Sequence, residues 1–353
     1  MQHLLLDVLQ PQTIVVFRAL QLGDMLCAVP ALRALRAACP HARITLVGLP
    51  WAAAFATRYP RHVDDFVAFP GFPGLPEQPP DSAALPGFLA AMRARRAGLA
   101  IQMHGNGTIT NPLVAQFGAR FNAGFGAPGS GDGAFLPYPD DGAEIRRLLA
   151  LMRFLGAPPV GEQLEFPLTA ADHAELAASG VAAGLRPNAY VCLHAGARAV
   201  ERRWPPERFA AIGDALHDDC GLPLVLTGSQ YETSITAAVT AAMRAPAIDA
   251  AAPISAGALA ALLGGARLLV CNDTGVAHLA AALKLPCVIV FRASEIARWA
   301  PLDRALHRPV WAPAARDDGV QHGGDEDLTE VLAQARALLA MPARHATVPA
   351  PAP

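Results

Sequence analysis

The chain has 353 residues, of which 53% are hydrophobic and 16% are charged, with 28 basic and 30 acidic side chains. Such a length accommodates two domains. The near balance of charge excludes a global field that would attract nucleic acid or an acidic membrane, so any recognition of anions has to be local.

The N-terminal segment and the cysteines favour a cytoplasmic protein. The first residues, MQHLLLDVLQPQ, lack the basic region and the full apolar core of a signal peptide. The longest uncharged stretch, residues 250–266, is too short and too rich in Ala and Gly to span a bilayer. Six cysteines form no CxxC pair and no zinc spacing, which indicates buried thiols and no metal site.

Short apolar runs alternate with longer helical patterns in the first half of the chain, which is typical of a parallel, doubly wound sheet. Pro30 predicts a kink or a late start for the first long helix. Residues 69–81 are rich in Pro and Gly and are predicted to be irregular, either over an interdomain cleft or on the surface. The expected strands are 13–17, 44–49, 63–69 and 99–104, and the expected helices are 25–38 and one near 51–58.

The same alternation restarts after a proline-bearing stretch, so we predict two Rossmann-like halves joined near 157–185. The expected strands are 190–196, 223–228, 268–273 and, as the final one, 287–291. The expected helices are 206–219, one near 231–243, 276–284 and 326–340. The predicted domains are residues 1–165 and 166–340, followed by a disordered tail at 341–353.

The stretch CNDTGVAHLAAAL, residues 271–283, indicates an anion site at the end of a buried strand. Asp273 or Thr274 suits the N-cap of the following helix, and Gly275 lets a ligand approach the backbone. The first N–H groups of that helix point beyond the carboxyl end of the strand, where open α/β sheets bind ligands such as a diphosphate. The alternative is an ordinary capped helix, with His278 an unremarkable neighbour.

An arginine-rich loop follows the first strand of the second half. The segment HAGARAVERRWPPERF, residues 194–209, carries Arg198, Arg202 and Arg203 between a strand and a helix. In a compact domain this loop is expected to face the Asp273 corner, and a cation beside a helix N-terminus is a common diphosphate clamp. The alternative is a solvated basic loop.

Another candidate lies in FRALQLGDMLCAVPAL, residues 17–32, where Gly23 and Asp24 stand at a helix entrance. Asp24 either caps the helix or faces the cleft as a general base toward an acceptor hydroxyl. The segment is not a dinucleotide fingerprint, because G-x-G-x-x-G is absent, and it is not a P-loop, because neither GKS nor GKT follows.

Other polar residues stand at strand ends. His104 and Asn106 follow the fourth strand and are expected to reach the cleft, where His104 is either an acceptor ligand or a structural histidine. Glu232 begins the helix after LTGSQ and either hydrogen-bonds a ribose or favours the helix dipole. A solvated helix face is predicted for three arginines, Arg93, Arg95 and Arg96.

Three segments together resemble glycosyltransferase family 9, the family of the ADP-heptose–lipopolysaccharide heptosyltransferases. They are LGDMLCAVPALRALR, HAGARAVERRWPPERFAAIGDAL and NDTGVAHLAAALKLPCVIVF. The resemblance extends from about residue 13 to 340. It implies the α/β fold called GT-B, in which two Rossmann-like, doubly wound domains face each other across a cleft. The acceptor is then expected in the N-terminal domain and the donor in the C-terminal domain.

The resemblance also implies roles for individual residues. Asp24 matches the proposed catalytic aspartate of the family, and Arg202 stands where many members carry a lysine that contacts a donor phosphate. Thr274, Gly275 and His278 match the start of the diphosphate-binding helix.

Two further positions concern the nucleoside and the acceptor. Glu232 matches an acidic position near the donor nucleoside, and Asp273 is expected to share in phosphate binding. Residues 104–112 lack the basic residue that inner-core heptosyltransferases tend to carry after this strand, which leaves the acceptor open.

The expected function is an inverting, metal-independent transfer of a sugar, without a cofactor. The donor implied is ADP-heptose or another nucleoside-diphosphate sugar, and the acceptor is a hydroxyl of a lipopolysaccharide core or a related glycan. Transient contact with the inner face of the inner membrane is compatible with this function, and no nucleic-acid partner is expected. The alternatives are the same chemistry on another glycan or a protein, a sugar-nucleotide epimerase or hydrolase, and a nucleotide-sugar-binding protein without catalysis.

Overall fold

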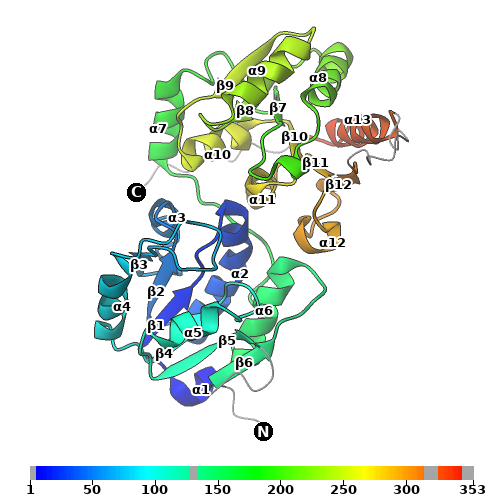
Figure 1. Ribbon diagram of the computed structural model, residues 1–353. Helices are drawn as coiled ribbons and strands as arrows, with labels where there is room; N and C mark the ends of the chain where they lie inside the picture. The colour runs from blue at the N-terminus through cyan, green and yellow to red at the C-terminus, as the bar shows by residue number, and fades with distance from the viewer. Residues whose placement is uncertain (1–4, 127–132, 314–324, 344–353) are drawn as a thin grey trace. The chain divides into compact units, whose positions relative to one another are not determined.

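The computed structural model describes residues 5–126, 133–313 and 325–343. Contacts divide the chain into two compact units, Met1–Leu164 and Glu165–Pro353. Each unit is built around a sheet of six strands, and the strand pairs of both sheets are parallel (Figure 1). The tail predicted to be disordered lies outside the described residues from position 344 onward.

The N-terminal unit alternates strands and helices as the sequence predicts, and it also contains a short helix ahead of the first strand. Its elements are α1 (Leu5–Leu9), β1 (Thr13–Phe17), α2 (Leu22–Ala38), β2 (Arg43–Gly48), α3 (Ala52–Ala56), β3 (Asp65–Ala68), α4 (Leu85–Ala94), β4 (Leu99–Gln102), α5 (Thr110–Ala115), β5 (Phe121–Gly126), β6 (Gly133–Pro137) and α6 (Glu144–Leu155).

The strand order of this unit, β3-β2-β1-β4-β5-β6, places β1 and β4 side by side at the point where the winding direction reverses. Phe17 is aligned with Gln102 in that pair, so the residues that follow both strands emerge together at the carboxyl edge. Open sheets bind ligands at such a switch point. The candidate residues of this unit are therefore gathered by topology, although they lie about 80 positions apart in sequence.

Helices cover both faces of the N-terminal sheet. α2 and α6 pack against each other on one face, as Figure 1 shows, while α4 and α5 cover the other. The rings of Phe69 and Phe117 meet that of Phe17 edge-on, at 5.0 and 6.0 Å between centroids. Edge-on contact is a favourable geometry for aromatic rings, and these contacts hold the end of β1 in place.

The prediction for the first long helix was wrong at its start. α2 begins at Leu22 rather than at residue 25, with Gln21 as its N-cap, and it continues through the buried Pro30. The N–H of Met25 already donates to the carbonyl of Gln21 at 2.9 Å, so the turn closes one residue after Asp24. A proline costs one backbone hydrogen bond, but burial against α6 holds the helix together.

The C-terminal unit repeats the same architecture. Its elements are α7 (Ala170–Ser179), β7 (Val191–His194), the 3-10 turn η1 (Val200–Arg202), α8 (Pro206–Cys220), β8 (Leu224–Gly228), α9 (Thr233–Ala242), β9 (Ala247–Ala251), α10 (Ala256–Gly265), β10 (Leu268–Asn272), α11 (Gly275–Ala282), β11 (Cys287–Phe291), α12 (Ile296–Trp299), β12 (His307–Trp311) and α13 (Glu326–Leu339).

The order β12-β11-β10-β7-β8-β9 puts β7 beside β10, again at the reversal of the winding. β11 was predicted to be the final strand, and this was wrong, because β12 pairs with it from His307 to Trp311. The segment HRPVW contains an arginine and a proline, so its composition does not indicate a strand. Both residues are tolerated because β12 lies at the sheet edge, where a proline removes no ladder hydrogen bond toward a further strand.

Among the helices of the described segments, none combines the length and the apolar character that a bilayer span requires.

Candidate functional site

The amide of Asn272, the last residue of β10, ties together two segments at the carboxyl edge of the C-terminal sheet. Its Nδ2 donates to the carbonyl of Ala195 at 2.8 Å, and its Oδ1 accepts from the N–H of Trp204 at 3.0 Å. Asn272 is fully buried, so both bonds form away from water. The arginine-rich loop after β7 is thereby held at both ends against the strand that leads to α11.

Arg202 lies at the end of η1 and reaches the corner after β10. Its Nη1 is 3.2 Å from Oδ2 of Asp273, whose side chain is only 3% exposed, whereas that of Arg202 is 36% exposed. The hydroxyl of Ser294, in the segment after β11, also donates to Asp273. Three segments that follow three neighbouring strands therefore meet at one carboxylate, and the cation has one side open to solvent.

The structure decides between the two residues that were predicted as the N-cap of α11. Thr274, not Asp273, is the N-cap, with φ −152° and ψ 173°, while the Asp273 carboxylate is engaged by Arg202 and Ser294. Within the described residues the Thr274 side chain makes no capping hydrogen bond. The first turn of α11, beginning at Gly275, thus lacks the side-chain cap that would otherwise occupy its N–H groups.

His278 lies one turn into α11 and is buried. Its ring meets that of Trp299 at 6.4 Å between centroids, with the planes at 72°. The aromatic contact connects the first turn of α11 to α12, so His278 is placed by packing at the same corner.

Glu232 follows β8, and its carboxylate lies against Gly196, the second residue after β7. It is the N-cap residue of α9, and its carboxylate accepts from the N–H and the hydroxyl of Ser229 at 2.8 and 2.9 Å. A side chain at Gly196 would collide with this carboxylate, which explains the glycine. Burial lowers the pKa of the neighbouring His194, while the negative charge of Glu232 opposes that shift.

The second candidate region lies in the N-terminal unit, where Gly23 and Asp24 occupy the first turn of α2. Asp24 is therefore not the N-cap, although an acid in a first turn still gains from the helix dipole. Gly23 is buried and Asp24 is partly exposed. The turn presents Asp24 at the carboxyl edge of the sheet, directly after β1.

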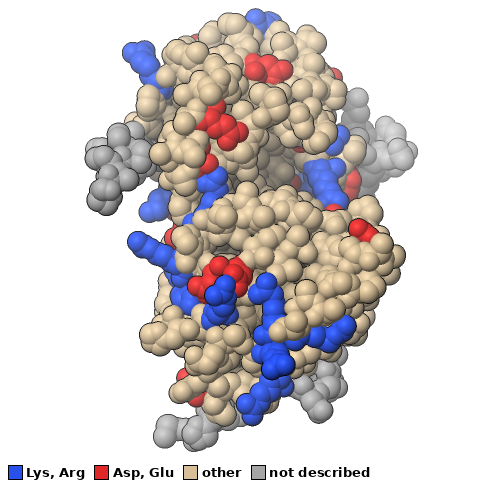
Figure 2. All heavy atoms as spheres, turned by 90° about the vertical axis from the view of Figure 1, so that its left-hand side faces the viewer, with Lys and Arg blue, Asp and Glu red and all other residues tan. Residues whose placement is uncertain are grey.

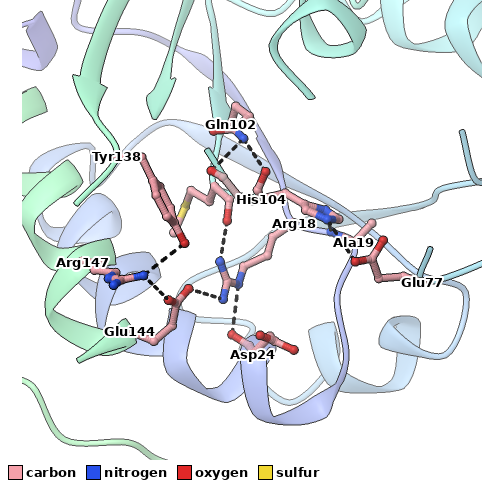
Figure 3. Close-up of polar contacts among 11 residues, drawn as sticks. Arg18, Ala19, Asp24, Glu77, Gln102, His104, Tyr138, Glu144 and Arg147 are labelled. Atoms are coloured by element: carbon pink, nitrogen blue, oxygen red, sulfur yellow. Dashed lines mark hydrogen bonds and ion pairs between the residues drawn. The ribbon is translucent and has the colours of Figure 1, made fainter. Parts of the chain in front are cut away.

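A buried arginine fixes this turn, and the sequence analysis did not assign it a role (Figure 3). Arg18 is 1% exposed, and its Nε donates to the main-chain carbonyl of Asp24 at 3.0 Å. Its Nη1 donates to the carbonyl of Met103, and its Nη2 lies 3.2 Å from Oε1 of Glu144. The guanidinium joins the ends of β1 and β4 to the N-terminus of α6, and Glu144 neutralises it.

His104 combines packing with two polar contacts. It stacks on Phe17 with 5.5 Å between centroids, its Nδ1 faces the N–H of Ala19 at 3.4 Å, and its Nε2 lies 3.6 Å from Oε1 of Glu77 (Figure 3). Glu77 belongs to the segment 69–81, which therefore lies against the end of β4. The side chain of His104 is only 7% exposed, which favours its structural role.

Asn106 lies two residues beyond His104. Its Oδ1 accepts from the N–H of Thr108 at 3.1 Å and shapes an exposed turn. This turn follows β4 at the carboxyl edge of the sheet. The strand order therefore places Asn106 at the same edge as Asp24.

The positive surface of the N-terminal unit lies away from these residues. Figure 2 looks onto the side of this unit that carries α4, and arginine side chains gather there. Arg93, Arg95 and Arg96 are exposed, as predicted, but only Arg93 lies within α4. They precede β4 and thus stand at the amino edge of the sheet, opposite to Asp24.

Most cysteine side chains lie in the interior of the protein. All six cysteines are within the described residues; none of them forms a disulfide, and five are buried. Burial raises the pKa of Cys192, Cys271 and Cys287, so these thiols are inert. Within the residues that the structure describes, no group of three or more His, Cys, Asp or Glu side chains is arranged to hold a metal ion.

Comparison with known proteins agrees with this geometry. Residues 144–311 match the family described as glycosyltransferase family 9 (heptosyltransferase). Lipopolysaccharide heptosyltransferase 3 of Escherichia coli is 28% identical over 131 residues, which is 36% of this chain. That match spans 38% of the length of the relative.

Solved structures extend the likeness to nearly the whole chain. A glycosyltransferase family 9 protein from Veillonella parvula DSM 2008 has a TM-score of 0.76 at 19% identity and covers 93% of this chain and 97% of its own. The E. coli ADP-heptose lipopolysaccharide heptosyltransferase II has a TM-score of 0.68 at 20% identity, with coverages of 93% and 98%. With two Rossmann-like units of identical strand order, the fold is that of a GT-B protein. Residues 144–311 are therefore similar to glycosyltransferase family 9, and the fold of the chain is similar to that of solved proteins of that family.

Proposed function

We propose that the protein is a glycosyltransferase that moves a sugar from a nucleoside-diphosphate sugar to a hydroxyl of a glycan acceptor. The observation that carries this proposal is the corner after β10, where Nη1 of Arg202 lies 3.2 Å from Asp273, one residue before the N-cap of α11. A diphosphate at this corner meets a cation and a helix N-terminus together. The match of residues 144–311 to glycosyltransferase family 9 supports the same assignment.

The donor is held by the C-terminal unit. Thr274 and Gly275 offer the N–H groups of the first turn of α11, Arg202 supplies positive charge, and His278 lies beside them. Asp273 acts by holding Arg202, because a second anion in direct contact with the phosphates would repel them. Glu232, at the end of β8, is the hydrogen-bond acceptor for the ribose.

Asp24 is the general base. It takes the proton of the acceptor hydroxyl while that oxygen attacks the anomeric carbon, and the bond to the diphosphate breaks with its electron pair leaving on the phosphate oxygen. Attack opposite to the leaving group inverts the configuration. A positioned base contributes a factor of about 10²–10⁴. A preorganised donor toward the developing charge contributes about 2.7–4 kcal/mol.

The finer assignment is a heptose from ADP-heptose, transferred to a lipopolysaccharide core or a related glycan without a metal or a cofactor. It is supported by the names of the relatives, among them an E. coli heptosyltransferase solved with ADP-2-deoxy-2-fluoro heptose. A glycolipid acceptor requires transient contact with the inner face of the inner membrane. On the N-terminal unit, Gly23, His104 and Asn106 stand nearest to the acceptor.

The first experiment is a thermal-shift screen of nucleotide sugars, in which ADP-heptose is expected to stabilise the protein more than UDP- or GDP-sugars do. The labelled donor is then incubated with and without lipopolysaccharide core acceptors, in the presence and absence of EDTA. Transfer that depends on acceptor and resists EDTA supports the proposal. Donor consumption without acceptor indicates an epimerase or hydrolase, and binding without turnover indicates a sensor; either result contradicts it.

A further inference from the structure

Arg292 is the first residue after β11, and its position places it at the same edge as the Asp273 corner. Asn272 is aligned with Val290 in the pair of β10 and β11, and the N–H of Asp273 donates to the carbonyl of Val290 at 3.0 Å. Arg292 thus leaves the sheet beside the two residues that lead into α11. The sequence analysis gave it no role.

The guanidinium of Arg292 is in an unfavourable state in the protein alone. Its Nε is buried and has no hydrogen-bond partner, and among the described residues Arg292 forms no ion pair. Burial lowers the pKa of Arg292, which shows that its charge is poorly solvated. Buried donors are almost always satisfied in native proteins, so an unpaired one calls for a partner beyond the residues that the structure describes.

The nearest acid does not supply that partner. Asp327 influences Arg292 through its charge, but its carboxylate already accepts from Nε1 of Trp204 at 2.8 Å and from Nη1 of Arg208 at 3.2 Å. It also accepts from the N–H of Leu328 at 2.8 Å. Three of the roughly four acceptor positions of the Asp327 carboxylate are therefore used within α8, α13 and the loop after η1.

The segment that carries Arg292 is joined directly to the proposed donor site. Two residues further on, the hydroxyl of Ser294 donates to Asp273, which is the residue that binds Arg202. We infer that Arg292 is a second cation of the donor site and binds a phosphate oxygen of the nucleoside diphosphate. This inference rests on the proposed function and adds to it a residue that makes the site selective for a diphosphate over an uncharged nucleoside.

Arg267 offers a matched control on the same sheet. It is also a buried arginine with one unpartnered nitrogen, but it precedes β10 and stands at the amino edge, where its Nη2 donates to the carbonyl of Leu339 at 2.7 Å. Arg267→Gln removes a buried guanidinium from the opposite edge. Arg292→Gln removes a buried guanidinium from the proposed site. Arg292→Lys keeps the positive charge but loses the planar, forked set of N–H donors.

The experiment is calorimetric titration of the full-length variants with the nucleoside diphosphate that best stabilises the wild type among ADP, UDP and GDP. Thermal shift with the corresponding nucleoside accompanies it. Arg292→Gln is expected to weaken diphosphate binding by about tenfold to a hundredfold, the range for a hydrogen bond to a charged group. Arg292→Lys is expected to weaken it less, and the nucleoside shift is expected to stay unchanged. The melting temperature of Arg292→Gln without ligand is expected not to fall, because no bond within the protein is lost.

Arg267→Gln is expected to show the opposite pattern, with a lower melting temperature and diphosphate affinity within about twofold of wild type, because its lost bonds are internal. If Arg292→Gln binds the diphosphate with wild-type affinity while an Arg202 variant binds it weakly, the inference is overturned and the proposed function stands. Equal weakening of diphosphate and nucleoside also overturns it. A wild type that binds none of the three diphosphates overturns the donor site itself.

Discussion

The Nε of Arg18 donates to the main-chain carbonyl of Asp24 at 3.0 Å, so a buried guanidinium holds the backbone of the residue proposed as the base (Figure 3). The same guanidinium is 3.2 Å from Glu144, which balances its charge. This contact to the backbone fixes the first turn of α2, in which Asp24 lies. A catalytic group gains most when its supporting residues are themselves locked in place.

Glu144→Gln tests that support. The change leaves the buried Arg18 without its counter-charge, and removing one partner of a buried pair typically costs about 3–5 kcal/mol. We expect the free energy of unfolding, measured by urea denaturation, to fall by this order. The control is Glu162→Gln, which breaks the exposed pair with Arg146, whose side chain is 62% exposed. A loss below about 1 kcal/mol is expected there. Equal losses in the two variants would show that the Arg18 pair is no more important than a surface pair.

Asp24→Asn tests the base. The amide keeps the size of the side chain and the backbone bond to Arg18, but it cannot accept the proton. We expect turnover to fall by about 10²–10⁴, with the donor dissociation constant close to that of wild type. Steady-state kinetics and calorimetry measure the two quantities. Retained turnover would remove Asp24 from this role, and a parallel loss of donor binding would point to a disturbed structure.

Arg202→Ala tests the donor clamp. The variant loses the cation nearest to the start of α11, so the dissociation constant of the nucleoside diphosphate is expected to rise about tenfold or more. Arg186→Ala, an exposed arginine that precedes β7 at the other edge of the sheet, serves as the control and should bind as wild type does. If both variants bind equally well, Arg202 does not contact the phosphates.

His194→Asn tests the pH dependence of stability. Burial lowers the pKa of His194, while Glu232 and the hydrogen bond to Thr227 oppose that shift. The pKa in the folded protein therefore lies below the usual value of about 6.5. The stability that comes from keeping this imidazole neutral is complete above that value and is lost as the pH falls through it, because the unfolded chain then binds the proton more tightly.

Urea denaturation at pH 7.5 and 5.5 measures this loss. The wild type is expected to lose at most about 1.4 kcal/mol per pH unit through this single proton, and His194→Asn should lose correspondingly less. His307, whose pKa burial also lowers, contributes in the same direction and remains in the variant. His41→Asn, at an exposed position, serves as the control for replacing a histidine elsewhere in the chain. An identical slope in all three proteins would contradict the assignment.

Periodicity predicted the buried strands and the long helices of both units, because strands such as β1 and β10 consist of consecutive buried residues. It failed for β12, whose His307–Trp311 segment has the composition of a loop and is a strand only because β11 offers an edge. It also missed the start of α2. The hydrogen bond from the N–H of Met25 to the carbonyl of Gln21 belongs to a helix that begins at Leu22, ahead of the predicted start at residue 25.

The candidate residues were predictable where they lie in the segments that connect a strand to the next helix or in its first turn, as Asp24, Arg202 and Thr274 do. The supporting residues were not, because their roles depend on partners distant in sequence. Arg18 and Glu144 are 126 positions apart, and Arg202 and Asp273 are 71 apart. The one sequence signal was a charged or amide residue directly after a buried apolar run, which Arg18, Asn272 and Arg292 share.

The amide of Asn272 has a consequence for how this protein can vary. Because it anchors the loop at Ala195 and again at Trp204, the stretch between these anchors can change its composition without changing where it starts and ends. Substitutions at exposed positions such as Val200 therefore alter the surroundings of a donor at little cost in foldability. A library restricted to this stretch is the economical route to altered donor preference, whereas one that includes Asn272 would mostly return proteins that fail to fold.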